Sequence, residues 1–124
     1  MAIRFASDMA KTLELSPEAI DLVAARFKVM GEPFRLRLIQ ALDHGERSIG
    51  ELAQVLSSSQ PNVSKHAKIL HAAGLIARRQ EGNTVYCSIA DNSVYDLCEV
   101  VRSSLRGQIE KQNLSLAAKR SGRR

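Results

Sequence analysis

The sequence is poor in aromatic residues, which make up 4% of its 124 residues and include no tryptophan. Hydrophobic residues nevertheless amount to 44%, so the core has to be built from Leu, Ile, Val and Ala. Such a core favours a helical protein over a β-sandwich, because strands are enriched in aromatic and β-branched side chains. The length allows one domain with a modest core.

Long hydrophobic runs are also missing. No apolar run approaches the ~20 residues that a bilayer-spanning helix needs, and residues 1–16 lack the continuous apolar stretch of a signal peptide. We therefore expect a cytoplasmic protein with no membrane partner.

Signals for catalysis are absent too. No Ser/His/Asp or Cys/His set lies on a plausible pocket, and no glycine-rich phosphate loop occurs in the sequence. The only two cysteines, Cys87 and Cys98, lack CxxC spacing and are expected to be reduced thiols in a cytosolic protein. We predict no enzyme, no catalytic residue and no cofactor.

The positive charge is unevenly placed. The net charge is +5, but the last six residues contain Lys119, Arg120, Arg123 and Arg124, and the preceding 118 residues hold 14 basic and 13 acidic residues. Within that nearly neutral part, residues 57–90 carry four basic residues against Glu81 alone. A basic patch in one short segment favours a polyanionic partner, although a solvated surface would have the same composition.

Helix signals begin at Ser16 and recur at Pro33. Ser16 can cap a helix that has Pro17 in its first turn and apolar residues at helical spacing, and Gly31 ends it. Residues 1–15 are predicted to be an N-terminal arm, 16–112 one domain, and 113–124 a flexible basic tail.

The centre of the chain predicts two short helices in close succession. Ser48 and Glu51 form a capping box before an apolar pattern that ends near Leu56. After a short break, Ser59 and Pro61 start another helix, which Gly74 ends. Two short helices with only a few residues between them are typical of a helix-turn-helix.

The pattern then changes to that of strands. Residues 75–80 and 84–89 are predicted to pair as a β-hairpin joined at residues 81–83, with Arg78 and Arg79 flanking the turn. A last helix is predicted from about residues 91–93, and its apolar stripe is too long for so small a domain to cover. We therefore expect a partner on this stripe.

The second helix of the pair carries the functional side chains. Its outward face shows amide, hydroxyl and ammonium groups, which are the groups that read base edges and hold phosphates when a helix enters the major groove. Together with the hairpin, these groups predict the following double-stranded DNA contacts: Ser59, Gln60, Asn62, Ser64, Lys65, His66, Lys68, Arg78 and Arg79.

Residues 20–105 resemble the ArsR/SmtB family of winged-helix repressors. The resemblance rests on residues 31–38, the capped segment 48–56, the stretch SSSQPNVSKHAKILHAAGL at 57–75, and the hairpin at 79–86. It implies a mainly α winged helix-turn-helix of order α-α-α-α-β-β-α, a homodimer formed by the first and last helices, and repression of a palindromic operator. It also implies that Gln60, Asn62, Ser64 and Lys65 face the groove, with His66 at the DNA backbone.

The two best-known metal sites of that family are not reproduced. Ala53 and Gln54 occupy the places of the expected thiols, and no histidine follows His71 to pair with Asp91. A zinc-like ion needs about four N, S or O donors, so no metal site is predicted. His44, His66 and His71 are interpreted as surface or DNA-proximal residues.

The inducer is left open between a small molecule and a redox signal. Cys87 and Cys98 are either small buried hydrophobic residues or thiol sensors, and the resemblance favours Cys98 for a redox- or sulfide-sensing role. A protein-interaction module is a further alternative, although it would have no need of the polar, cationic helix face. The predicted homodimer interface comprises Ile20, Val23, Val94, Leu97, Cys98, Val101 and Leu105.

Overall fold

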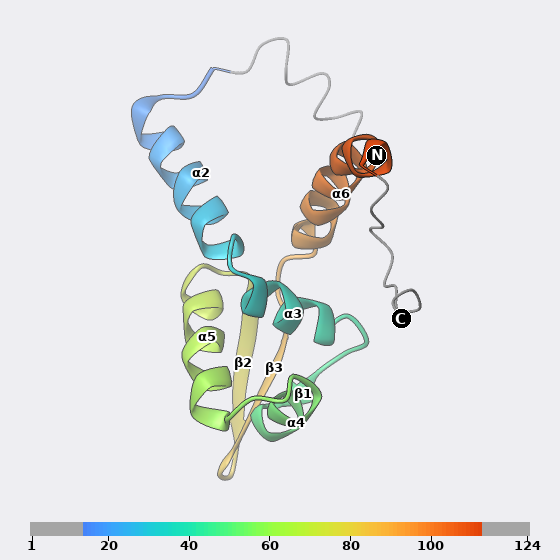
Figure 1. Cartoon of the computed structure of the whole chain (residues 1–124). Coiled ribbons are helices and arrows are strands. Elements are labelled where there is room, and N and C mark those ends of the chain that lie inside the picture. The colour runs from blue at the N-terminus through green and yellow to red at the C-terminus, as the bar shows by residue number, and fades with distance from the viewer. Residues whose placement is uncertain (1–13, 113–124) are drawn as a thin grey trace. The chain divides into compact units, whose positions relative to one another are not determined.

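The computed structural model describes residues 14–112. Their elements follow in the order α2 (Pro17–Met30), α3 (Pro33–Ala41), β1 (Arg47–Ser48), α4 (Ile49–Val55), α5 (Gln60–Ala72), β2 (Ile76–Glu81), β3 (Thr84–Ile89) and α6 (Ser93–Lys111) (Figure 1). The described residues divide into two compact units, one covering Glu14–Asn92 and the other beginning at Ser93. The predicted arm, except residues 14 and 15, and the predicted tail lie outside the described residues.

The helix starts follow the predicted caps. The Ser16 hydroxyl accepts a hydrogen bond from the Ala19 amide at 3.1 Å, and Ser48 and Glu51 form a reciprocal capping box with bonds of 2.8 and 3.0 Å. These bonds satisfy backbone amides that have no partner within the helix. At α3 the cap is a residue the pattern did not single out: the Glu32 carboxylate accepts from the Arg35 amide.

The helix α5 ends in a Schellman motif. Gly74 adopts a positive φ of 81°, the Leu75 amide bonds to the Leu70 carbonyl, and the Gly74 amide bonds to the His71 carbonyl. Beyond this end, Arg26 of α2 donates to the Ala73 carbonyl at 3.1 Å and lies 3.7 Å from the Asp91 carboxylate. These contacts fix the end of α5 against α2.

The sheet has one strand more than predicted. The strand β3 lies between β1 and β2 in an antiparallel sheet, with Arg47 and Arg78 both opposite Cys87. Two residues are too few to show the alternation of buried and exposed side chains that predicts a strand. Only the pairing with β3 makes Arg47 and Ser48 a strand. The predicted winged helix-turn-helix is confirmed, and β1 is an addition to the predicted order.

The hairpin register corrects the position of its arginines. Glu81 is opposite Thr84, and the loop consists of Gly82 and Asn83. Gly82 has a positive φ of 63°, which glycine adopts without the steric cost of a Cβ. Glu81 and Thr84 therefore flank the turn, and the expectation that Arg78 and Arg79 do so is wrong.

The core is aliphatic, as the composition predicts. It lies between the helices and one face of the sheet and contains no buried aromatic or charged side chain among the described residues. Its members in the unit Glu14–Asn92 are Met30, Leu38, Ile39, Leu42, Leu52, Ala53, Val63, Ala67, Leu70, Leu75, Ile76 and Cys87. Burial of the inward stripe of α5 in this core determines which of its side chains remain available outside. None of the helices at residues 14–112 is both long and apolar enough to cross a bilayer.

Candidate nucleic-acid interface

The turn before α5 determines how this helix is presented. Ser57 has φ +52°, a left-handed conformation for which glycine is the usual residue. The Ser58 amide bonds to the Ala53 carbonyl at 2.9 Å, which closes the end of α4 over the turn. The helix α5 then begins two residues later, capped by the Ser59 hydroxyl, which accepts from the Asn62 amide at 3.2 Å.

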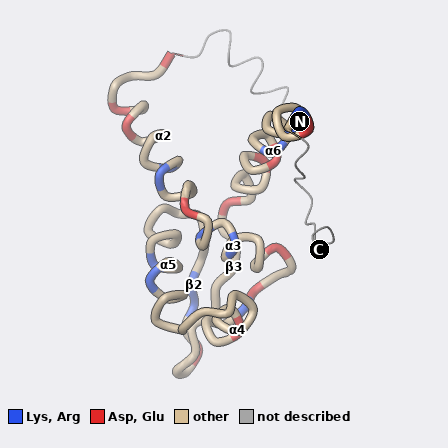
Figure 2. The backbone as a smooth tube through the Cα atoms, in the orientation of Figure 1, with Lys and Arg blue, Asp and Glu red and all other residues tan. Residues whose placement is uncertain are grey.

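Four of the predicted DNA-contacting residues on α5 have polar groups with no partner in the described part of the chain. Gln60, Lys65 and Lys68 are exposed and Ser64 is half-buried, and the side chains of all four make no hydrogen bond or ion pair with residues 14–112. The helix contains no acidic residue, and Figure 2 shows basic positions along α5 and β2. This face is equipped to bind an anion that also presents hydrogen-bonding groups.

Two other predicted residues of α5 use their side chains inside the protein. The Asn62 side-chain amide donates to the Ser58 hydroxyl at 3.0 Å, which ties the first turn of α5 to the preceding turn. The ring of His66 packs against Phe34 of α3, with 4.9 Å between the ring centroids. Asn62 and His66 therefore lie on the edge of α5 that faces the turn and α3.

Burial also determines the charge of His66. Its Nδ1 is buried with no hydrogen-bond partner in the described residues. Desolvation lowers the pKa of His66, Lys65 and Arg35 add smaller effects of the same sign, and the Glu32 carboxylate opposes them. A histidine whose pKa is lowered is neutral at pH 7, so it adds no cation to this face.

The two arginines of the hairpin have different surroundings. Arg79 donates two hydrogen bonds to Glu46, at 2.8 and 2.9 Å, and one to Glu81 at 2.9 Å, and it stacks over Tyr86 at 4.5 Å. The bonds to both carboxylates raise its pKa further, and the bond from Arg79 lowers the pKa of Glu46. Arg78 is half-buried, and its Nε has no partner in the described residues.

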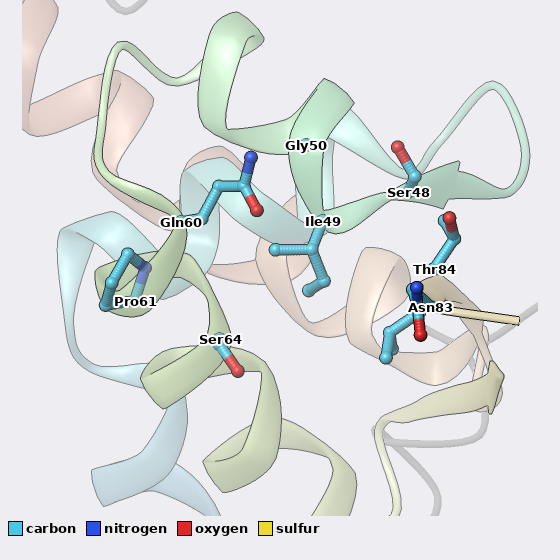
Figure 3. A pocket seen from close by; sticks show the side chains of 9 residues that line it. Ser48, Ile49, Gly50, Gln60, Pro61, Ser64, Asn83 and Thr84 are labelled. Atoms are coloured by element: carbon cyan, nitrogen blue, oxygen red, sulfur yellow. The ribbon is translucent and has the colours of Figure 1, made fainter.

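A hollow opens beside Gln60 and Ser64 of α5. Its volume is about 570 Å³, and it lies between the start of α4, the start of α5 and the tip of the β2–β3 hairpin (Figure 3). It is lined by Ser48, Ile49, Gly50, Gln60, Pro61, Ser64, Asn83, Thr84 and Val85. The sequence pattern singles out only Gln60 and Ser64 from this set for a role in binding. No local pattern connects three segments that meet only in the folded chain.

The predicted dimer stripes are largely uncovered. Ile20 and Val23 of α2, and Val101 and Leu105 of α6, are between 40% and 51% exposed, and the neighbouring Phe27 is 53% exposed. Leu97 and Cys98 are half-buried. Val94 differs from the others, because it is only 1% exposed in the single chain and presents no surface to a partner.

Both cysteines are free thiols. Cys87 is buried in the sheet and Cys98 is half-buried on α6. Burial raises the pKa of both thiols, and the nearby Arg78 partly offsets it at Cys87. A raised pKa leaves less thiolate at neutral pH, which slows oxidation and metal binding.

The chain is similar to several known regulators. Residues 32–78 match the model of the family described as "Bacterial regulatory protein, arsR family". A transcriptional repressor SmtB homolog from Synechocystis is 34% identical over 98 residues, covering 75% of this chain and 74% of the relative.

Solved structures share the fold. Rv0081 of Mycobacterium tuberculosis has a TM-score of 0.68 and 30% identity, covering 79% of this chain and 98% of that one. The homodimeric winged helix-turn-helix DNA-binding domain of Mb0332 from Mycobacterium bovis has a TM-score of 0.66 and 24% identity, covering 86% and 99%. With three quarters of the SmtB homolog covered at this identity, the chain belongs to the arsR family of bacterial regulatory proteins.

Proposed function

We propose that this protein is a homodimeric, sequence-specific transcriptional repressor that acts in the cytoplasm. Each subunit inserts α5 into the major groove, so the dimer binds the two halves of a palindromic operator. An inducer, either a small molecule or a redox signal, releases the DNA. One observation carries the proposal: Gln60, Ser64, Lys65 and Lys68 lie together on α5 with no partner in the described part of the chain.

The chemistry of these side chains suits two tasks. A glutamine amide can donate to and accept from a base edge, and a serine hydroxyl can do the same over a shorter reach. The two lysines supply charge that binds phosphates whatever the sequence. We assign base reading to Gln60 and Ser64, and phosphate binding to Lys65 and Lys68.

The dimer is supported by the exposed apolar stripes on α2 and α6. A patch of this kind is costly to leave in water and marks an interaction surface. A two-fold axis would place two copies of α5 about one helical turn of DNA apart, ~34 Å, which matches an inverted repeat. The homodimeric state of Mb0332 is consistent with this arrangement.

The test compares a duplex that the wild-type protein selects from a random library with a mixed-sequence duplex. Gln60→Ala and Ser64→Ala should each weaken binding to the selected duplex by ~1–3 kcal/mol, with a much smaller effect on the mixed duplex. Gln40→Ala, which removes an exposed glutamine of α3, is the matched control and should change neither affinity.

Two results would contradict the proposal. Equal losses on both duplexes for Gln60→Ala and Ser64→Ala would show that α5 does not read sequence. Failure of the wild-type protein to enrich any duplex from the random library, or to bind the mixed-sequence duplex, would favour a protein-interaction module. Thiol sensing through Cys98 has no observation of its own in its favour, because burial raises the pKa of that thiol.

A further inference from the structure

The side chain of Arg26 joins three parts of the chain at the end of α5. It leaves α2, donates a hydrogen bond to the Ala73 carbonyl at 3.1 Å, and lies 3.7 Å from the Asp91 carboxylate. Ala73 is the C-cap of α5, and Asp91 lies two residues before the start of α6 at Ser93. One guanidinium therefore connects a proposed dimer helix to the end of α5 and to the segment that leads into the other proposed dimer helix.

The chemistry of both partners suits an arginine. The last carbonyls of a helix have no partner within the helix and carry the negative end of its dipole, so the Ala73 carbonyl favours a cationic donor. The Nη2 of Arg26 donates to this carbonyl while its Nη1 faces the carboxylate of Asp91. A guanidinium holds its donors in one rigid plane. A lysine has a single nitrogen on a flexible stem and cannot fix both partners in this way.

Arg26 also lies beside the exposed apolar stripe of α2. Val23, three residues earlier, is 40% exposed, and Phe27, the next residue, is 53% exposed. Residues three apart are neighbours on a helix surface. The guanidinium stem therefore leaves α2 next to side chains that the proposed dimer would cover, and it connects this part of α2 with α5 of the same subunit.

The attachment of α5 to the dimer helices affects how a dimer fits its operator. In a two-fold dimer, the distance between the two copies of α5 depends on how each copy is held relative to the dimer helices. Both copies bind together only where the two half-sites are separated by the matching distance. One additional base pair moves the half-sites ~3.4 Å further apart and also rotates one about the DNA axis relative to the other.

We propose that Arg26 is a positioning residue that sets the distance between the two copies of α5, and thereby selects the spacing of the operator half-sites. The proposal rests on the proposed function, because it needs both the dimer and the contact of α5 with DNA. In this role Arg26 does not touch DNA and acts through the Ala73 carbonyl. Base preference belongs to the outward side chains of α5, and spacing preference belongs to Arg26.

His71 provides a matched control at the same end of α5. Its Nδ1 lies 3.1 Å from the Ile76 carbonyl, and because a carbonyl can only accept, the ring nitrogen donates. This bond joins α5 to β2, which is not a dimer helix. His71→Ala therefore removes one hydrogen bond from the end of α5 without removing its link to α2, and it controls for a merely structural effect.

The test measures the affinity of the full chain for a series of duplexes that carry both halves of the selected operator. The spacing between the halves is shortened by one base pair, kept, or lengthened by one or two. The wild-type protein should lose roughly tenfold or more in affinity when one base pair is added, because the DNA has to deform, and Arg26→Gln and Arg26→Lys should lose about threefold or less. Both variants should remain folded dimers by sedimentation and keep the wild-type base preferences within each half.

His71→Ala should keep the wild-type dependence on spacing while lowering the thermal unfolding midpoint. A wild-type dependence in both Arg26 variants would overturn the proposal. An equal flattening by His71→Ala would also overturn it, because any loosening of the end of α5 would then suffice. A monomeric Arg26→Lys would assign Arg26 to the dimer contact instead. Failure of the proposed function has a different signature, since the wild-type protein itself would then show no preference for the selected duplex or for any spacing.

Discussion

At the scale of single residues, the structure divides a helix face that looks uniform in the sequence. Gln60 and Asn62 are both amides in the first turn of α5, yet only the Gln60 amide makes no hydrogen bond within residues 14–112. Asn62 donates to Ser58 across the turn, where Ser57 holds a left-handed conformation. We infer that Asn62 positions α5 and does not read a base.

Asn62→Ala and Ser58→Ala test this role. Each removes the same hydrogen bond, so each should weaken binding to the selected duplex to a similar extent, by about 1 kcal/mol. The double variant should be no weaker than either single variant, because one interaction cannot be lost twice. Affinity measurements on duplexes with single base-pair changes should show that all three variants keep the wild-type base preferences. A preference relaxed at one base pair by Asn62→Ala alone would restore Asn62 to the reading residues.

At the scale of elements, the strand β2 of the hairpin forms hydrogen bonds with the loop before β1. Arg79 of β2 makes a two-pronged contact with Glu46, and the residues are 33 positions apart in the sequence. Arg79 and Glu46 are 52% and 37% exposed in their side chains, so solvent screens the pair and it adds little to folding stability. The pair links the loop before β1 to β2, the strand that leads to the hairpin tip.

The salt dependence of DNA binding tests whether Arg79 also contacts phosphate. Arg79→Gln combined with Glu46→Gln removes the pair while leaving the net charge unchanged, and we expect the slope of log K against log salt to stay at its wild-type value. Lys68→Gln should lower that slope by ~0.9 per subunit, since it removes one phosphate contact. A similar drop in the double variant would assign Arg79 to the DNA backbone.

At the scale of the whole molecule, the exposed apolar side chains of α2 and α6 predict that two copies of the chain associate. The uncovered stripe on α6 includes Val101, which is 48% exposed in the single chain. A charge at an exposed position costs little in a monomer, but burying it unpaired in an interface is costly. The folding of one chain and the pairing of two chains can therefore be perturbed separately.

Val101→Glu should convert the dimer to a folded monomer with weakened operator binding. Sedimentation equilibrium at micromolar concentration would measure the mass, and circular dichroism would confirm the helix content. Val55→Glu is the matched control, since Val55 of α4 is 52% exposed but lies outside the α2 and α6 stripes, so the dimer should persist. A wild-type protein that sediments as a monomer would contradict the proposed assembly.

Local signals were enough to predict most of the elements from the sequence. The caps at Ser16, Ser48 and Ser59 and the stop at Gly74 depend on hydrogen bonds that span three to five residues. Because both partners of each bond lie in one short segment, the sequence displays them together. The aliphatic core followed from composition, and the polar outward face of α5 followed from its helical period.

Tertiary structure decided what local signals could not contain. The strand β1 exists because Arg47 and Ser48 pair with Cys87 and Tyr86, and Arg79 meets Glu46 only when the sheet has formed. The engagement of His66 by Phe34 and the hollow between α4, α5 and the hairpin likewise join segments far apart in the chain. The sequence by itself determined which groups this protein can offer to DNA, through their types and their spacing. Which of them remain free to do so depended on the folded chain, both on the turn that brings Ser58 to Asn62 and on the distant contact of Phe34 with His66, because a polar side chain that is satisfied inside the fold is less available outside it.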